Sequence, residues 1–154
     1  MTPVEIIEYE DRYHEDFRAM NIEWLDHYNL TEPPDLEVLN DPRKTILEKG
    51  GVIYLARYDG QIAGSAALMK EHDHYELAKM AVAKPYQKMG ISKLLIERCL
   101  AKAQELRTHK VVLFSNHQLK AALGLYEKYG FQYVPMKDSP FLTADIKMEL
   151  TLNP

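Results

Sequence analysis

The sequence has few of the features that mark secreted, membrane-spanning or nucleic-acid-binding proteins. Its 154 residues include a single cysteine, Cys99, which excludes an internal disulfide and favours a reducing cytoplasm. No apolar run approaches the length of a membrane span, and the acidic N-terminal stretch lacks the apolar core of a signal peptide. The formal net charge of -4 also argues against nonspecific binding to nucleic acids or anionic membranes, which require a basic face.

The apolar content, in contrast, is sufficient for one compact domain. Hydrophobic residues make up 46% of the chain, and we find no low-complexity segment, internal repeat or linker. We therefore expect a single domain over residues 1–154, located in the cytoplasm.

The N-terminal third is expected to be mainly helical. A short strand is predicted at 4–9 and a helix at 12–28, where apolar residues recur at three- and four-residue spacing. Trp24, on the apolar face of this helix, is expected in the core. A break is expected over 29–34, because Pro33 and Pro34 cannot continue the helix. Asp35 is then expected to cap a short helix, and a further helical segment is predicted between 41 and 50.

An antiparallel meander follows. The strongest turn signal of the chain is Asp59-Gly60, which predicts a hairpin between strands at 52–58 and 61–70. A second turn leads into a third strand at 74–82. These three strands are expected to pair in the order in which they occur.

The pattern then changes to a helix at 91–106 and a nearly continuous apolar strand at 110–115. A connection of this length implies that the strand at 110–115 lies parallel to the strand at 74–82, joined by a right-handed crossover. A helix at 119–129 and two final strands, at 131–134 and 144–152, complete the chain. The fold class is therefore α/β, with a mixed sheet that contains one parallel pair.

The loop from Gln87 to Ser92 opens directly into the helix at 91–106. The first turn of a helix has N–H donors without partners, and the helix dipole makes that end positive. Gly90 has no side chain to obstruct an anion, and Lys88 can add charge. The loop is therefore predicted to bind a pyrophosphate; the alternative is an ordinary helix start that contains a glycine.

Two motifs resemble those of the GCN5-related N-acetyltransferase (GNAT) family. The segment Val82–Ser92 (VAKPYQKMGIS) is similar to its acetyl-CoA loop, Gln/Arg-x-x-Gly-x-Gly/Ala, although Ser92 replaces the final small residue. We expect this serine to have a small effect on cofactor affinity. The segment Leu125–Phe131 (LYEKYGF) is similar to a later motif, and the order of predicted elements also agrees.

The resemblance implies the acyl-CoA N-acyltransferase (GNAT) fold, a mixed and mostly antiparallel sheet with one central parallel pair, flanked by helices. It also implies that acetyl-CoA is the co-substrate, with its arm in the gap between the parallel strands. The residues expected to bind it are Met80, Ala81, Val82, Gln87, Lys88, Met89, Gly90, Ile91, Ser92 and Asn116. For Asn116 the alternative is a helix N-cap.

Glu76 is the candidate general base. Strand alternation places it on the face of Ala78, Met80 and Val82, and a carboxylate on an apolar face is costly unless it is paired or functional. Partial burial would raise its pKa toward neutrality. In the family, a glutamate at this position often takes the proton of the incoming ammonium. The alternatives are an ion pair with Lys79 or a helix lysine, or a β-bulge that changes the alternation.

The resemblance makes Tyr126 the candidate general acid, because the family places this tyrosine against the CoA sulfur. A phenol with a pKa of about 10 is protonated at neutral pH and can donate to a thiolate. The alternative is a tyrosine that only packs in the core. The family also forms its acceptor wall from the end of the first helix and the loop that follows, where Tyr28 is our candidate.

The expected activity is transfer of an acetyl group from acetyl-CoA to a primary amine of a small molecule or peptide, by direct attack. No metal is expected, because His72-Asp73-His74 lies in a predicted turn without a third ligand. Two other functions stay open: a non-catalytic acyl-CoA-binding or sensing module, and a protein-interaction domain that does not bind CoA. A homodimer also stays open.

Overall fold

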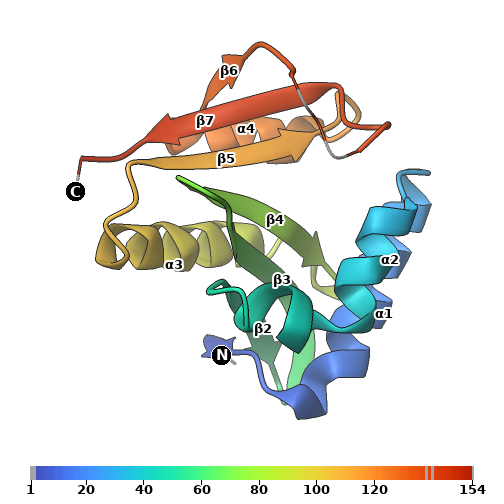
Figure 1. The fold of residues 1–154 in the computed structure, drawn as a ribbon. Coiled ribbons are helices and arrows are strands. Elements are labelled where there is room, and N and C mark those ends of the chain that lie inside the picture. The colour runs from blue at the N-terminus through green and yellow to red at the C-terminus, as the bar shows by residue number, and fades with distance from the viewer. Residues whose placement is uncertain (1–2, 138, 140, 154) are drawn as a thin grey trace.

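The computed structural model describes residues 3–137, 139 and 141–153, which form a seven-stranded sheet covered by helices on both faces (Figure 1). The strand order is β1-β2-β3-β4-β5-β7-β6. The strands are β1 (Val4–Glu8), β2 (Val52–Tyr58), β3 (Gln61–Lys70), β4 (Tyr75–Val82), β5 (Lys110–Ser115), β6 (Gln132–Val134) and β7 (Ile146–Thr151). The helices are η1 (Asp11–Tyr13), α1 (His14–His27), α2 (Pro33–Asn40), η2 (Arg43–Leu47), η3 (Lys84–Tyr86), α3 (Ile91–Glu105) and α4 (Lys120–Lys128).

Strands β1 to β4 form the expected antiparallel meander. The bounds of β2 and β3 agree with those predicted. Asp59 and Gly60 join them with φ angles of 50° and 77°. Two consecutive positive φ angles match the right-handed twist of a tight hairpin, which explains why an Asp-Gly pair is placed there.

The parallel pair consists of β4 and β5, connected by α3. Only two positions pair, Tyr75 with Val111 and Glu76 with Val112. Beyond Glu76 the two strands separate, although each continues for several residues. β7 lies between β5 and β6 and is antiparallel to both, so the predicted mixed α/β sheet is confirmed.

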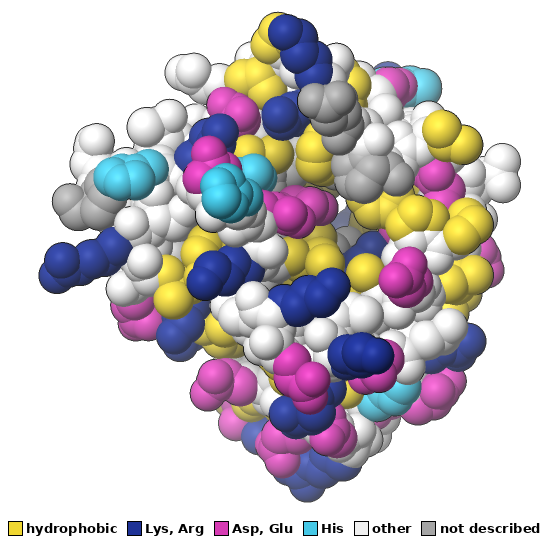
Figure 2. All heavy atoms as spheres, viewed as in Figure 1, with side chains coloured by type: hydrophobic (Ala, Val, Ile, Leu, Met, Phe, Trp, Pro, Cys, Tyr) yellow, Lys and Arg dark blue, Asp and Glu magenta, His cyan; other side chains and the backbone are white. Residues whose placement is uncertain are grey.

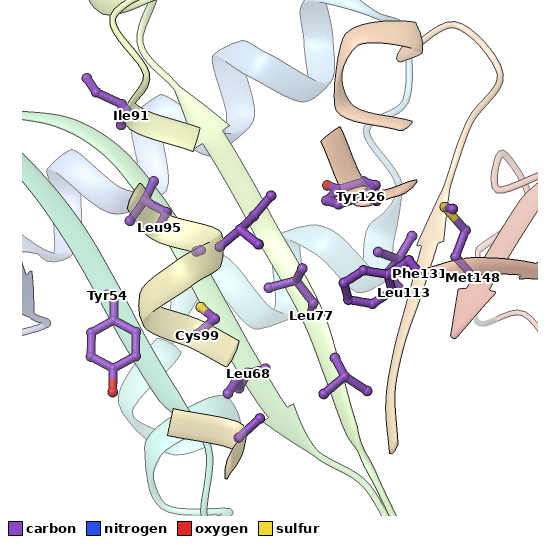
Figure 3. Packing of buried hydrophobic residues seen from close by; sticks show 14 of the residues in the cluster. Tyr54, Leu68, Leu77, Ile91, Leu95, Cys99, Leu113, Tyr126, Phe131 and Met148 are labelled. Carbon is purple, nitrogen blue, oxygen red and sulfur yellow. The ribbon is translucent and has the colours of Figure 1, made fainter. Parts of the chain in front are cut away.

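Two apolar cores lie on opposite faces of the sheet. The larger is formed with α3 and α4, and Figure 3 shows Leu95 and Cys99 of α3 next to Leu77 of β4. The smaller lies beneath α1 and η2, where Phe17 and Ile46 are buried. Each helix therefore buries one apolar stripe against the sheet, as amphipathic spacing predicts.

The prediction for the segment after α1 was wrong in one respect. Helix α2 begins at Pro33, rather than at a cap formed by Asp35. The first two positions of a helix need no N–H donor, so Pro33 and Pro34 start this helix, whereas α1 already ends at His27. Asp35 lies inside the first turn, where its Oδ2 accepts the N–H of Glu32 at 3.0 Å.

Candidate active site

Two hollows meet at the point where β4 and β5 separate. The larger, about 610 Å³, extends over the loop before α3 and over α4, and the smaller, about 120 Å³, borders α1 and α2. Trp24, Met80, Leu119 and Tyr126 line both hollows. The face in Figure 2 is hollowed near its centre, where acidic, basic and hydrophobic side chains meet. The two hollows are therefore neighbours along these four side chains.

The larger hollow contains most of the residues predicted to bind the cofactor. Its lining includes Met80, Ala81, Val82, Gln87, Lys88, Gly90, Ile91 and Ser92. Met89 does not line it and is 40% exposed. Asn116 lines the smaller hollow instead. The structure thus brings the predicted strand and loop residues together around the larger hollow, except for Met89 and Asn116.

The loop before α3 has the geometry of an anion site. Gly90 has a φ angle of 79° and precedes the first residue of α3, and a Cβ placed on it would meet no atom within 4 Å. Lys88 also has a positive φ angle, and the Gln87 amide donates to the Val82 carbonyl at 3.2 Å, which closes the loop onto β4. The N-terminal N–H groups of α3 therefore border an open space.

The charges around this loop agree with that geometry. The larger hollow is lined by four lysines and by no carboxylate among the described residues. The lysines are Lys88, Lys93, Lys120 and Lys128. An open cradle at a helix N-terminus with cationic walls fits the pyrophosphate of a CoA-type molecule.

Glu76 lies in the smaller hollow and is 8% exposed. Burial, with a smaller contribution from the charge of Glu71, raises the pKa of Glu76 to about 7. It is not paired with Lys79, whose ammonium contacts Asp35 instead. A carboxylate with this pKa can accept a proton near neutral pH.

A β-bulge in β4 overturns the predicted alternation. Ser65 pairs with Ala81 and Ala67 with Ala78, so one residue of β3 opposes two of β4. Leu77 and Val82, five positions apart, both pack in the core beneath α3. The expectation that Glu76 shares a face with Met80 and Val82 was therefore wrong, because the extra residue inverts the side-chain order beyond it.

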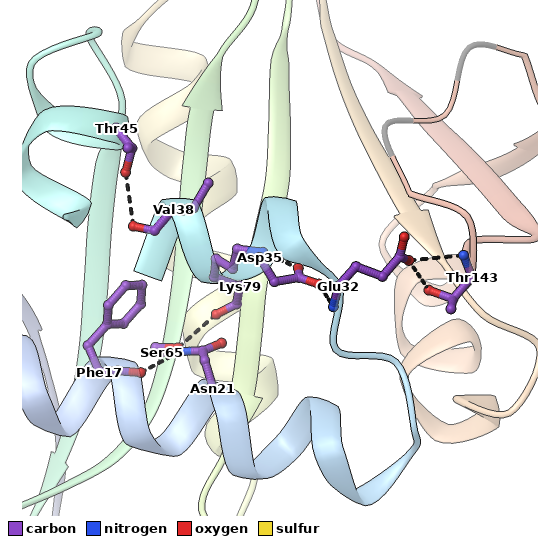
Figure 4. A network of polar contacts seen from close by, with 9 residues as sticks. All are labelled: Phe17, Asn21, Glu32, Asp35, Val38, Thr45, Ser65, Lys79 and Thr143. Carbon is purple, nitrogen blue, oxygen red and sulfur yellow. Dashed lines mark hydrogen bonds and ion pairs between the residues drawn. The ribbon is translucent and has the colours of Figure 1, made fainter. Parts of the chain in front are cut away.

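The bulge is held by a buried polar network centred on Lys79, whose φ angle is 53° (Figure 4). The Ser65 hydroxyl donates to the Lys79 carbonyl at 2.7 Å, and the Asn21 amide donates to the Ser65 oxygen at 3.0 Å. The Lys79 ammonium lies 2.6 Å from the Asp35 carboxylate. The bulge is thus held from α1 by Asn21, through Ser65, and from α2 by Asp35.

Tyr126 is buried in the larger core and also lines both hollows. Burial raises the pKa of its phenol to about 12, and its ring packs edge-on against Phe131 at 5.8 Å. The phenol is therefore protonated throughout the neutral range and is available as a proton donor. Packing in the core and access to the site, which we set as alternatives, occur together.

Asn116 has a structural role in the turn before α4. Its amide donates to the Thr143 carbonyl at 2.8 Å, and its oxygen accepts the N–H of Gln118 at 3.0 Å. The residue that caps α4 is Leu119, so the helix-cap alternative for Asn116 was wrong. A contact between Asn116 and the cofactor stays a prediction.

The walls of the site include residues that the sequence did not single out. Trp24, expected in the core, is half-buried and lines both hollows. The centroid of its ring lies 5.3 Å from that of Tyr28. Tyr28 itself lines the larger hollow and not the smaller. The four-residue spacing of these two aromatics on α1 could have indicated one shared wall.

The loop before β7 closes the other side of the smaller hollow. Glu32 accepts the N–H groups of Leu142 and Thr143 at 2.8 and 2.9 Å. The same loop places the Phe141 ring 5.3 Å from the Lys79 ammonium.

Among the residues that the structure describes, no three His, Cys, Asp or Glu side chains gather to hold a metal ion, and no helix is long and apolar enough to cross a membrane.

Comparison with known proteins identifies the family. Residues 11–131 match the model of the acetyltransferase (GNAT) family. An uncharacterized N-acetyltransferase of Mycobacterium tuberculosis is 33% identical over 105 residues, which are 68% of this chain and 63% of the relative. An uncharacterized N-acetyltransferase of Escherichia coli is 26% identical over 111 residues, 70% of this chain and 64% of the relative. The matches therefore span less than two thirds of these relatives.

Solved structures show the same fold. A GNAT-family acetyltransferase from Staphylococcus aureus has a TM-score of 0.88 at 21% identity, covering 98% of this chain and 100% of that one. The PaiA N-acetyltransferase from Thermoplasma acidophilum, solved in complex with coenzyme A, has a TM-score of 0.76 at 15% identity, covering 97% and 99%.

Proposed function

The chain belongs to the acetyltransferase (GNAT) family, and on this premise we propose that it transfers the acetyl group of acetyl-CoA to a primary amine. One observation carries the proposal. The two hollows meet where β4 leaves β5, with Glu76 in the smaller one and Tyr126 in both. A candidate base and a candidate acid thus line the hollow in which two substrates would meet.

The larger hollow suits acetyl-CoA. The N–H groups from Gln87 to Ser92, together with the lysines around them, would hold the pyrophosphate. The backbone of Met80 to Val82 would guide the arm toward the smaller hollow. When bound, acetyl-CoA supplies a thioester, whose carbonyl carbon is open to attack by an amine.

Glu76 prepares the acceptor. An alkyl amine has a pKa near 10, so it enters mainly as the ammonium and must lose a proton before it can attack. With a pKa of about 7, Glu76 is ionised in a large part of the population at neutral pH and can accept this proton, directly or through water. Its place in the smaller hollow fits this role.

Tyr126 completes the transfer. As the new C–N bond forms, the C–S bond breaks, and the Tyr126 hydroxyl donates its proton to the departing sulfur. The high pKa of Tyr126 keeps that proton available at neutral pH. The second proton, which the nitrogen loses as it becomes an amide, restores the phenol. Direct attack is favoured over an acyl-enzyme, because Cys99 is buried in the core and burial raises the pKa of its thiol to about 12.

Calorimetric titration with acetyl-CoA, followed by a panel of amines with detection of the released thiol, tests this function. Binding together with thiol release that depends on the amine is the expected result. Binding without release from any amine would identify a sensing module. Absence of binding would point to a protein-interaction domain in which the Gly90 loop is only structural.

A further inference from the structure

We propose that the acceptor is a primary amine that also carries a carboxylate, as an amino acid does, and that Lys79 binds this carboxylate. The inference rests on the proposed acetyl transfer and specifies its second substrate. It depends on the Lys79–Asp35 pair (Figure 4). Both side chains line the smaller hollow, as Glu76 does.

The pair is nearly buried. The Lys79 and Asp35 side chains are 6% and 5% exposed, and the ammonium lies 2.6 Å from the carboxylate. Removing two charges from water costs more than their attraction commonly returns, so a buried pair is weak as a stabilising device. Its position in the wall of a hollow that faces the reacting end of the site indicates that it serves a ligand.

The remaining hydrogen-bonding capacity of the pair lies mainly on the lysine. Both Asp35 oxygens are engaged, Oδ1 by Lys79 and Oδ2 by the Glu32 N–H at 3.0 Å. An ammonium has three protons, and Asp35 takes one of them. Lys79 is also the one cationic side chain among the described residues that line the smaller hollow. The polar group that it can receive is therefore a hydrogen-bond acceptor, and a carboxylate is the acceptor that would form the strongest, charge-assisted bond with it.

Lys79 is fixed in place before any ligand arrives. Its φ angle of 53° is unfavourable for a residue with a Cβ, and it persists because the surroundings hold it. The buried Ser65 hydroxyl bonds its carbonyl, and Asp35 holds its ammonium. A donor held in this way loses little conformational entropy when it binds.

The dimensions of the smaller hollow suit a compact acceptor. Its volume of about 120 Å³ is somewhat less than that of a cavity of about 150 Å³ that holds benzene. The enclosed part of the acceptor is thus limited to about half a dozen heavy atoms, which an amine, a carboxylate and the carbons between them supply. Glu76 would then receive the amine while Lys79 receives the carboxylate.

Matched acceptors test the inference on the unmodified protein. Alanine is compared with ethylamine, phenylalanine with phenethylamine, and lysine with cadaverine, by thiol release from acetyl-CoA. We expect the carboxylate member of each pair to have a kcat/KM higher by about 10- to 100-fold, as a charge-assisted hydrogen bond provides. Equal or better turnover of the decarboxylated members would overturn the inference. If only cadaverine were preferred over its amino acid, the inference would also fail, and Asp35 would be the residue that binds the second ammonium of the acceptor.

The variant Lys79→Met locates the effect. It should reduce the ratio of kcat/KM between acid and amine to nearly one, while Lys49→Met, an exposed lysine outside both hollows, leaves the ratio unchanged. Because Lys79→Met leaves the Asp35 charge buried without a partner, the double variant Lys79→Met/Asp35→Leu provides a second comparison with neither charge. A ratio that survives both variants would exclude Lys79 as the carboxylate site.

A binding measurement separates this inference from the proposed activity. The thermal shift of the protein saturated with CoA is recorded with each member of the matched pairs. Stabilisation by the amino acids and not by the amines, without thiol release, would retain the carboxylate site and reject acetyl transfer. Thiol release from amines of every kind, without preferential binding of the amino acids, would retain acetyl transfer and reject the carboxylate site.

Discussion

The ammonium of Lys79 lies 2.6 Å from the carboxylate of Asp35, so the strained residue of β4 is tied to helix α2. One consequence concerns Glu76, three residues earlier on the same strand. Because Lys79 is engaged by Asp35, its charge compensates Glu76 only weakly, and burial dominates the pKa of Glu76. Asp35 thus offsets part of the effect by which Lys79 lowers the pKa of Glu76, and the pair also forms part of the wall of the acceptor hollow.

Glu76→Gln should lower kcat by about 100-fold or more, the usual contribution of a general base. In the wild type, kcat/KM should rise with pH through about 7 as Glu76 loses its proton, and this rise should be absent in the variant. Steady-state rates between pH 5.5 and 9 measure both effects, with Glu105→Gln, at the far end of α3, as the control. An unchanged rate and profile would remove Glu76 from the mechanism.

Glu76→Gln should also stabilise the protein at high pH. Glu76 has a folded pKa of about 7 against 4.5 in the unfolded chain, so the folded state binds the extra proton. Its contribution to stability is present below pH 4.5 and is lost as the pH rises through 7, a difference of roughly 3 kcal/mol. Urea unfolding at pH 5 and pH 8 should therefore show Glu76→Gln gaining much more stability over the wild type at pH 8 than at pH 5. Equal pH dependence in the two proteins would contradict the burial argument.

Asp35→Asn should destabilise the protein by about 3 to 5 kcal/mol, because it leaves the Lys79 ammonium buried without its partner. It should also lower the pKa of Glu76, which the Asp35 charge helps to raise. The rise of kcat/KM would then occur at lower pH. The exposed pair of Arg43 and Asp11 offers a control, since Asp11→Asn should change stability much less. Similar losses from both variants would argue against a special role for the buried pair.

Tyr126→Phe removes one hydroxyl and preserves the ring that packs against Phe131. We expect kcat to fall by about 100-fold while the dissociation constant for acetyl-CoA stays within a few-fold. Tyr129→Phe is the matched control, because that hydroxyl contacts Glu97 at 2.7 Å on the exterior. Normal turnover by Tyr126→Phe would show that the phenol only packs.

Gly90→Ala separates backbone strain from ligand binding. Gly90 and Gly60 have φ angles of 79° and 77°, and in both a Cβ would meet no atom within 4 Å. Each alanine variant should therefore lose about 1 to 2 kcal/mol of stability. Only Gly90→Ala should lower the affinity for acetyl-CoA, by about tenfold, because its methyl group enters the space that the pyrophosphate would use. Calorimetry on both variants decides this, and equal affinities would place the pyrophosphate elsewhere.

Local patterns were sufficient for most of the elements. The Asp59-Gly60 turn and the apolar run of β5 depend on neighbours in sequence, and both lie where they were predicted. The start of α2 was missed because proline is compatible with two opposite roles, the end of one helix and the first turn of the next. Trp24 was assigned to the core because periodicity does not distinguish an aromatic that lines a hollow from one that fills the interior.

The sequence by itself determined the proposed cofactor half of this site. A glycine at a helix start and the strand that leads into it lie within 20 residues, so their arrangement follows from backbone preferences alone. Only the tertiary structure decided the acceptor half. Lys79 and Asp35 meet across 44 positions of the chain, and the extra residue in β4 sets which side chains face the hollow. Such contacts depend on how distant elements pack, and no local pattern records them.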